Sequence, residues 1–112
     1  MMLAGAPSEP LVSVVIPTYN GGIWLLDTIA SCLCQESLTL EVIVVDDASS
    51  DDTPDRVVEL YPDVRLVRQP QNSGSGAHGR NTGLQLARGR YVKFLDHDDL
   101  LEPATLFREV AA

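Results

Sequence analysis

Two short runs of β-branched residues, each followed directly by a polar segment, constrain the fold of this chain most. Residues 12–16 precede a polar turn at 18–22, and residues 41–45 precede an acidic segment at 46–52. A run in which nearly every residue is apolar predicts a strand that is buried on both faces. Between the two runs, leucine and isoleucine recur at three- and four-residue spacing over residues 23–35, which predicts an amphipathic helix. The order strand, helix, strand indicates a parallel sheet.

The alternation of strand and helix continues to the end of the chain. The expected later elements are a helix capped by Asp52 or Thr53, a strand at 64–68, a helix at about 75–87, a strand at 90–95 and a helix that Pro103 opens. Right-handed crossovers between them predict an α/β fold, a Rossmann-like open parallel sheet of about four strands with flanking helices. We expect Pro17 to end the first strand. We expect a flexible N-terminal arm at 1–11 and one α/β domain at 12–112.

Composition restricts the classes of partner. The chain has 112 residues, of which 45% are hydrophobic and 21% are charged, as expected for one globular domain. The net charge of -8 comes from 16 acidic and 8 basic residues, which argues against a nucleic acid polymer as partner. A small phosphorylated ligand is still compatible with this charge, because a bound cation can mediate the contact.

The two cysteines point to a reducing environment. Cys32 and Cys34 lie two positions apart in a predicted helix, where their side chains diverge, so we expect two buried free thiols. The first ten residues lack a charged segment followed by a long apolar run, and no run approaches the length of a membrane span. The expected location is the cytoplasm, which includes the inner face of a membrane.

Three carboxylates within four positions follow the last predicted strand, at Asp96, Asp98 and Asp99. One interpretation is a polar turn, in which Asp is common. The other is a site for a hard divalent cation, Mg²⁺ or Mn²⁺, bound by carboxylate oxygens. His97 is expected to be an exposed spacer, because hard cations prefer oxygen ligands.

Ligands of open α/β sheets bind beyond the carboxyl ends of the strands. Three polar segments are expected at that edge: residues 18–20, 46–47 and 96–99. No Gly-x-Gly-x-x-Gly motif or P-loop follows the first strand, so the first helix is not favoured as a direct pyrophosphate site. Convergence of the three polar segments favours a functional site over an isolated polar turn.

A glycine-rich stretch precedes and enters the third predicted helix. Its glycines, at 74, 76, 79 and 83, would let the helix approach the sheet or a ligand closely, and for Gly83 close helix packing is at least as favoured. Arg80 is the cation of this stretch. It has two interpretations, contact with a phosphate or an ion pair with an aspartate.

Four motifs lie in order along the chain, at residues 12–20, at 45–51, at 72–74 with 80–83, and at 94–99. The first reads Val-Ser-Val-Val-Ile-Pro-Thr-Tyr-Asn, and the last contains Asp-x-Asp. In the second, Ala48 stands where glycine is usual. Together they resemble the opening part of the inverting family-2 glycosyltransferases, which have the GT-A fold.

The resemblance implies a role for each matching residue. Tyr19 would stack on the base of a nucleotide-diphosphate sugar, most commonly a UDP-sugar in this family, and Asp47 would accept a hydrogen bond from the base. Asp46 would support the turn, Arg80 would approach the base or phosphates, and Asp96 would contact the ribose side. The implied nucleotide site comprises Pro17, Thr18, Tyr19, Asn20, Asp46, Asp47, Arg80, Asp96 and Asp98, and the implied ligands of Mg²⁺ or Mn²⁺ are Asp98 and Asp99.

The family's acceptor half and catalytic base come after the stretch seen here. Asp51 and Asp52 do not match the position of the base. We therefore expect residues 12–112 to be the nucleotide-sugar-binding part of a glycosyltransferase, truncated relative to the full family domain and inactive alone, with an unidentified glycan or other acceptor. We also expect Leu106, Phe107 and Val110 to form an uncovered face that favours a homo-oligomer.

Two other functions compete with this interpretation. One is a non-catalytic module that binds a nucleotide or a protein partner. The other is a phospho-acceptor receiver domain, which carries its paired acids after the first strand. The paired acids Asp46 and Asp47 follow the second predicted strand here, so motif placement disfavours the receiver.

Overall fold

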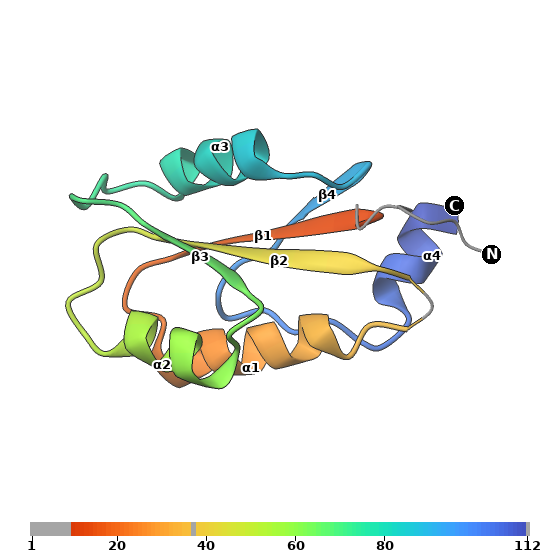
Figure 1. The fold of residues 1–112 in the computed structure, drawn as a ribbon, viewed down its shortest axis with the longest axis horizontal. Helices are drawn as coiled ribbons and strands as arrows, with labels where there is room; N and C mark the ends of the chain where they lie inside the picture. The colour runs from red at the N-terminus through yellow and green to blue at the C-terminus, as the bar shows by residue number, and fades with distance from the viewer. Residues whose placement is uncertain (1–9, 37, 112) are drawn as a thin grey trace.

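The described part of the chain, residues 10–36 and 38–111 of a computed structural model, forms one parallel sheet with flanking helices (Figure 1). The strands are β1 (Val12–Thr18), β2 (Leu40–Asp46), β3 (Arg65–Arg68) and β4 (Tyr91–Phe94), in the sheet order β3-β2-β1-β4. The helices are α1 (Gly22–Leu33), α2 (Thr53–Leu60), α3 (Gly76–Leu86) and α4 (Thr105–Ala111). All three strand pairings are parallel, which confirms the predicted fold class.

The sheet separates two unlike layers. Figure 1 shows α3 on one face and α1 with α2 on the other. Alternate residues of β1, at 12, 14 and 16, join Leu25 and Ile29 of α1 in the main apolar core. On the opposite face α3 packs through glycine, since a Cβ at Gly83 would lie 2.2 Å from a methyl carbon of Val15. The close-packing interpretation of Gly83 is confirmed, and α3 can lie this near to the sheet only without a side chain there.

β1 runs two residues further than predicted, so the expectation that Pro17 ends it is wrong. Pro17 pairs in register with Val45, and the Thr18 carbonyl accepts a hydrogen bond from the Asp47 N–H. Successive residues of a strand direct their backbone groups to opposite sides, so the nitrogen of Pro17 faces the β4 side. β4 ends at Phe94, so it has no strand residue beside Pro17 that would need a hydrogen bond from the nitrogen of residue 17. The missing N–H of the proline therefore costs the sheet no backbone hydrogen bond.

Helix α4 covers the end of the sheet opposite the polar segments. Leu106 is only 2% exposed and belongs to the core, and Val110 packs against that core. Phe107 is exposed. The expectation of a wholly uncovered apolar face on this helix is therefore wrong, because Leu106 lies in the same core cluster as Val12 and Val110 packs against that cluster.

Of the predicted N-terminal arm, only Pro10 and Leu11 lie within the described residues, and the Leu11 N–H donates to the Thr39 carbonyl. Cys32 is buried, as predicted, and burial raises the pKa of its thiol to about 12, whereas Cys34 is exposed, contrary to expectation. None of the described helices is long and apolar enough to cross a membrane.

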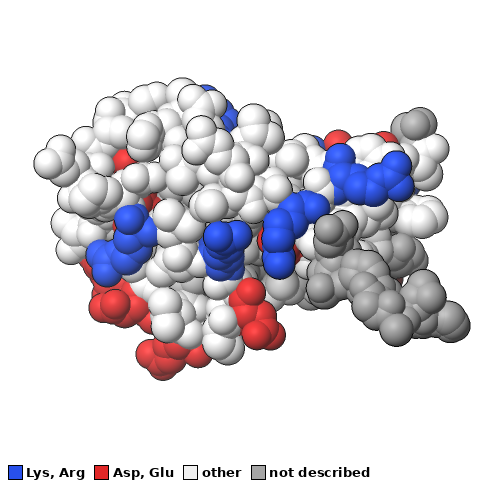
Figure 2. Space-filling view, turned by 45° about the horizontal axis from the view of Figure 1, so that its top comes forward, with Lys and Arg blue, Asp and Glu red and all other residues white. Residues whose placement is uncertain are grey.

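Basic side chains form a row on the face that Figure 2 shows. Figure 2 shows Lys and Arg side chains gathered in a row across one face, with acidic side chains grouped below them at one end. Some arginines have structural partners: Arg88 forms an ion pair with Glu41 at 3.3 Å, and Arg65 donates to the Leu86 carbonyl. Burial opposes ionisation of Glu41, but hydrogen bonds from Ser13 and Arg88, together with the charge of Arg88, hold its pKa below the ordinary value.

Candidate functional site

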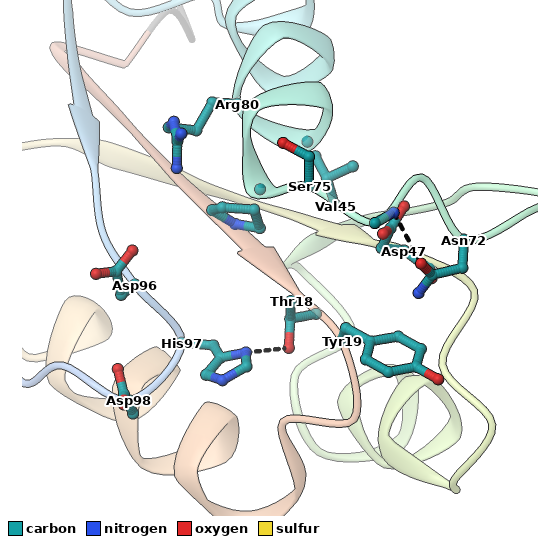
Figure 3. Close-up of a pocket in the computed structure, with 14 residues that line it drawn as sticks. Thr18, Tyr19, Val45, Asp47, Asn72, Ser75, Arg80, Asp96, His97 and Asp98 are labelled. Carbon is teal, nitrogen blue, oxygen red and sulfur yellow. Dashed lines mark hydrogen bonds between the residues drawn. The ribbon is translucent and has the colours of Figure 1, made fainter.

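A cleft of about 480 Å³ opens at the carboxyl ends of β1 and β2 (Figure 3). It is lined by Pro17, Thr18, Tyr19, Val45, Asp47, Asn72, Gly74, Ser75, Gly76, Gly79, Arg80, Asp96, His97 and Asp98. The predicted nucleotide residues all line it except Asn20 and Asp46. The other lining residues had not been predicted as site residues: Val45, Asn72, Gly74, Ser75, Gly76, Gly79 and His97.

The cleft has two chemically distinct ends. In Figure 3, Tyr19, Asp47 and Asn72 lie toward one end, and Asp96 and Asp98 lie toward the other. The Tyr19 ring is about half exposed, at 46%, so a flat group can reach it. An elongated ligand with a ring at one end and negative charge at the other would suit a cleft of this arrangement, provided that a cation accompanies it.

Asp46 and Asn20 shape the loops that lie beneath the cleft. Asp46 is fully buried, and its carboxylate accepts hydrogen bonds from the Ser49 N–H at 2.9 Å and the Ser49 hydroxyl at 2.5 Å. Asn20 joins the loop after β1 to the loop after β2, because its side-chain oxygen accepts from the Ser50 N–H at 2.9 Å. Ala48 has φ 63° and Asn20 has φ 51°, both in the left-handed region. The placement of Asp46 suits support of the turn.

Asp47 holds the glycine-rich loop against the end of β2. Its two carboxylate oxygens each lie 3.0 Å from the backbone nitrogen of Ser73, and the Ser73 hydroxyl donates to one of them. Asn72 donates to the Asp47 carbonyl at 3.1 Å and accepts from the Gly74 N–H at 2.8 Å. Asn72 and Gly74 of the motif at 72–74 line the cleft.

Helix α3 brings Arg80 to the cleft. The hydroxyl of Ser75 accepts from the Ala77 N–H and caps the helix. A Cβ at Gly79 would lie 2.8 Å from the Cβ of Pro17, so glycine lets this part of the helix rest on the end of β1. Among the described residues, Arg80 takes part in none of the ion pairs, and it lines the cleft as an exposed cation. This favours the phosphate interpretation over the structural ion pair.

The acidic residues after β4 form both a turn and a cluster. The Asp99 N–H donates to the Asp96 carbonyl at 3.1 Å, as in a turn. One carboxylate oxygen from each of Asp96, Asp98 and Asp99 lies within 4.8 Å of the others. Within the described chain no ion pair involves these three exposed side chains. A set of ligands made only of oxygen, without a neutralising cation from the protein, fits Mg²⁺ or Mn²⁺.

His97 does not behave as an exposed spacer, and that prediction is wrong. Its ring is half-buried and lines the cleft, and its Nδ1 lies 2.9 Å from the hydroxyl of Thr18. Thr18 is buried at the end of β1. No local sequence signal could have indicated this contact, because it joins two segments that only the sheet brings together.

Comparison with known proteins identifies the family. The family model described as glycosyl transferase family 2 matches residues 13–112. The chain belongs to this family. It is 42% identical over 102 residues to the succinoglycan biosynthesis protein ExoO of Rhizobium meliloti, covering 90% of this chain and 29% of that protein. It is 43% identical over 97 residues to a chondroitin synthase of Escherichia coli, covering 84% of this chain and 14% of that protein.

Solved structures agree with this assignment. TarS of S. aureus, residues 1–349, superposes with a TM-score of 0.82 at 33% identity, covering 89% of this chain and 31% of that one. The mannosyltransferase PcManGT of Pyrobaculum calidifontis gives a TM-score of 0.71 at 37% identity, covering 82% of this chain and 28% of that one. The chain thus spans about a third or less of these relatives, and it corresponds to the N-terminal part of a family-2 glycosyltransferase with the GT-A fold.

Proposed function

We propose that this chain binds the nucleotide-diphosphate part of a sugar donor, with Mg²⁺ or Mn²⁺, in a glycosyltransferase that transfers the sugar to an acceptor hydroxyl. The observation that carries the proposal is the two-ended cleft, with an exposed aromatic ring at one end and, at the other, two carboxylates of the cluster of three, those of Asp96 and Asp98. Membership of the glycosyltransferase family indicates that a ligand bound in this cleft would be the donor in a sugar transfer. A UDP-sugar is the proposed donor, because TarS has been solved with UDP and with UDP-GlcNAc.

Each end of the cleft would hold a different part of the donor. Tyr19 would stack on the base, and the remaining acceptor capacity of Asp47 would receive a base N–H. Arg80 would face the phosphates, which it can contact through two parallel N–H groups. Asp96 would contact the ribose side. The buried residue Asp46 and its neighbour across the loops, Asn20, would act by holding the turns rather than by contact with the ligand.

Asp98 and Asp99 would bind the cation, and Asp98 would do so inside the cleft. PcManGT was solved with GDP-Man and Mn²⁺, which supports a divalent ion as the companion of the donor in this family. When bound, such a cation stabilises the negative charge that develops on the leaving diphosphate.

Calorimetric titration of UDP, GDP, CDP and dTDP and of their sugars tests the proposal, each with Mn²⁺ and with EDTA. We expect at least one nucleotide diphosphate to bind more tightly in Mn²⁺. Asp98→Asn and Asp99→Asn keep the side-chain shape and should weaken that binding about tenfold or more in Mn²⁺, with little effect in EDTA.

Asp63→Asn is the matched control, because this exposed aspartate lies between α2 and β3, outside the cleft. It removes the same charge and should leave the affinity unchanged. Equal affinities of wild type and both loop variants in Mn²⁺ would remove the metal role. Absence of binding by any nucleotide would overturn the proposed function as a whole.

A further inference from the structure

Helix α1 carries a polar stripe beside its buried apolar face. Thr28, Ser31 and Gln35 follow one another at spacings of three and four residues, so they lie along one face of α1 and its C-terminal extension. Thr28 is fully buried, whereas polar residues on such a helix normally point to water. All three side chains bind the backbone of the segment that follows β4, at residues 97–106.

The buried member of the stripe, Thr28, contacts the backbone before and after the two predicted cation ligands. The hydroxyl oxygen of Thr28 lies 2.9 Å from the carbonyl oxygen of His97 and 2.6 Å from that of Asp99. These two carbonyls flank Asp98 in the chain. The His97 carbonyl belongs to the peptide group before Asp98, and the Asp99 carbonyl belongs to the peptide group after Asp99. The single hydroxyl proton of Thr28 is therefore shared between the two peptide groups that bracket both predicted cation ligands.

The other two members continue the attachment. The Ser31 hydroxyl accepts from the Leu101 N–H at 3.1 Å and donates to the Thr28 carbonyl at 2.7 Å. Gln35 donates to the Glu102 carbonyl at 2.7 Å and accepts from the Leu106 N–H at 3.0 Å. Every contact with the segment is to main-chain atoms, so the stripe fixes the path of the backbone independently of the side chains along it.

The sheet supplies little support in this region. The last backbone bond between β4 and β1 runs from the Leu95 N–H to the Val15 carbonyl. The acidic loop begins at the next residue, Asp96. Three exposed carboxylates of like charge repel one another, so their spacing depends on the backbone that carries them. Among the described residues, α1 is the element that supplies side-chain hydrogen bonds to the carbonyls of that backbone.

We infer that Thr28 is a positioning residue for the cation site, with Ser31 and Gln35 extending the same attachment. This inference rests on the proposed function, because it concerns the affinity of the acidic loop for Mn²⁺. The hydroxyl holds the peptide group before Asp98 and the peptide group after Asp99, and the carboxylates are thereby kept at a spacing that one cation can bridge. Supporting hydrogen bonds of this kind typically change metal affinity by about 10–100-fold when they are removed.

A pair of substitutions separates the hydroxyl from the shape of the side chain. Thr28→Val replaces the hydroxyl by a methyl group of similar volume, and Thr28→Ser keeps the hydroxyl. Direct titration of Mn²⁺, followed by the paramagnetic resonance signal of the free ion, should show about tenfold weaker binding for Thr28→Val. Thr28→Ser should remain close to wild type. UDP affinity in Mn²⁺ should fall with Thr28→Val, and UDP affinity in EDTA should not change.

Ser13→Ala is the control for loss of a buried hydroxyl. Ser13 is fully buried near the start of β1, at the far end of the sheet, where it donates to Glu41 and accepts from the Gly89 N–H. This variant should lower stability without changing Mn²⁺ affinity. Amide hydrogen exchange in metal-free protein adds a readout that needs no ligand: exchange across residues 96–101 should accelerate in Thr28→Val but not in Ser13→Ala.

The outcomes distinguish this inference from the function on which it rests. If wild type binds neither Mn²⁺ nor UDP with Mn²⁺, the proposed function fails and the inference fails with it. If wild type binds both and Thr28→Val binds Mn²⁺ equally well, the inference alone is overturned. If Thr28→Ser is as weak as Thr28→Val, side-chain packing rather than the hydroxyl is responsible, which also overturns it.

Discussion

The hydroxyl of Thr18 and the Nδ1 atom of His97 lie 2.9 Å apart and join residues that are 79 positions apart in the chain. Thr18 is the last residue of β1, the central strand on which both sides of the cleft depend. His97 sits inside the acidic loop. This contact ties the end of β1 to the carboxylates at one end of the cleft.

Removal of the His97 ring should weaken the cation end of the cleft. His97→Ala loses the bond to Thr18, and we expect severalfold weaker nucleotide binding in Mn²⁺ and a loss of about 1 kcal/mol in unfolding free energy. His97→Asn places a polar atom near the position of Nδ1 and should recover most of both. Calorimetry and denaturant unfolding measure the two quantities. If His97→Asn binds nucleotide as weakly and is as unstable as His97→Ala, loss of the hydrogen bond to Thr18 is not the cause of either effect.

Asp47 should affect both the loop and the choice of base. Asp47→Asn replaces one acceptor oxygen by an NH₂ donor. The new NH₂ group cannot accept a hydrogen bond from the Ser73 N–H or from a base N–H at the same position. We expect weaker binding of the preferred nucleotide and a smaller difference in affinity between UDP and GDP. Ser73→Ala removes only the hydroxyl bond to Asp47. If Ser73→Ala reduces the discrimination between bases equally, the effect comes from loop anchoring rather than from contact with the base.

The contact between α3 and β1 should not tolerate a methyl group. Gly83→Ala would place its Cβ 2.2 Å from Val15, inside van der Waals contact. Alanine gains about 1 kcal/mol of helix propensity over glycine, but overpacking should outweigh it and leave the variant about 1–3 kcal/mol less stable overall. Gly76→Ala, which meets only the movable end of Arg80, is the stability control.

A second substitution checks that the clash is the cause. Val15→Ala removes the methyl groups that a new Cβ at position 83 would meet. In a double-mutant cycle, Gly83→Ala should be less harmful in the Val15→Ala background than in wild type. Strict additivity of the two substitutions would show that the loss of stability has another origin.

Stability should decline in alkaline solution because of Cys32. Burial raises the pKa of this thiol from an ordinary value near 9.0 to about 12. The unfolded chain loses the thiol proton near pH 9, whereas the folded chain retains it. The contribution of this group to stability is therefore fully present below about pH 9 and is lost as the pH rises toward 12. Denaturant unfolding between pH 7 and 10 should show the decline, and Cys32→Ala should reduce it.

Thiol labelling distinguishes the two cysteines at neutral pH. Cys34 is exposed and should react with a disulfide reagent at the rate of an ordinary thiol. Cys32 should react only when the protein opens. Rapid labelling of both thiols in folded protein would contradict the burial of Cys32, and Cys34→Ser should remove the fast phase alone.

The strands and the first helix could be predicted because each depends on the pattern of apolar residues within its own segment. The position of the site, at the edge of the sheet where the strands have their carboxyl ends, followed from these elements. The apolar runs that became β1 and β2 admit few alternatives in a chain with helical spacing between them. The convergence of Asp47 with Asp96 and Asp98 follows from parallel topology alone. Tyr19 and Arg80 were assigned through family resemblance, which also identified the loop at 72–74.

The features that escaped prediction depend on distant partners. Pro17 stays in β1 because β4 is short, and strand length in a neighbour cannot be read from the sequence around a proline. His97 is fixed by Thr18, and Leu106 is buried by the ends of two strands. Thr28 is the clearest case, since threonine within a helix is unremarkable until the carbonyls of the acidic loop are placed beside it.

The left-handed backbone of Ala48 has a consequence for the thermodynamics of binding. A residue with a Cβ loses roughly 1–2 kcal/mol in that conformation. The turn after β2 is held against this cost by the buried Asp46 carboxylate, which accepts two hydrogen bonds from Ser49, and by the Asn20 side chain, which accepts from the Ser50 N–H. The turn is therefore already ordered before any ligand arrives, and little conformational entropy remains to be lost there on association. Ala48→Gly would relieve the strain yet loosen the unliganded turn, exchanging a preorganised site for a more stable fold.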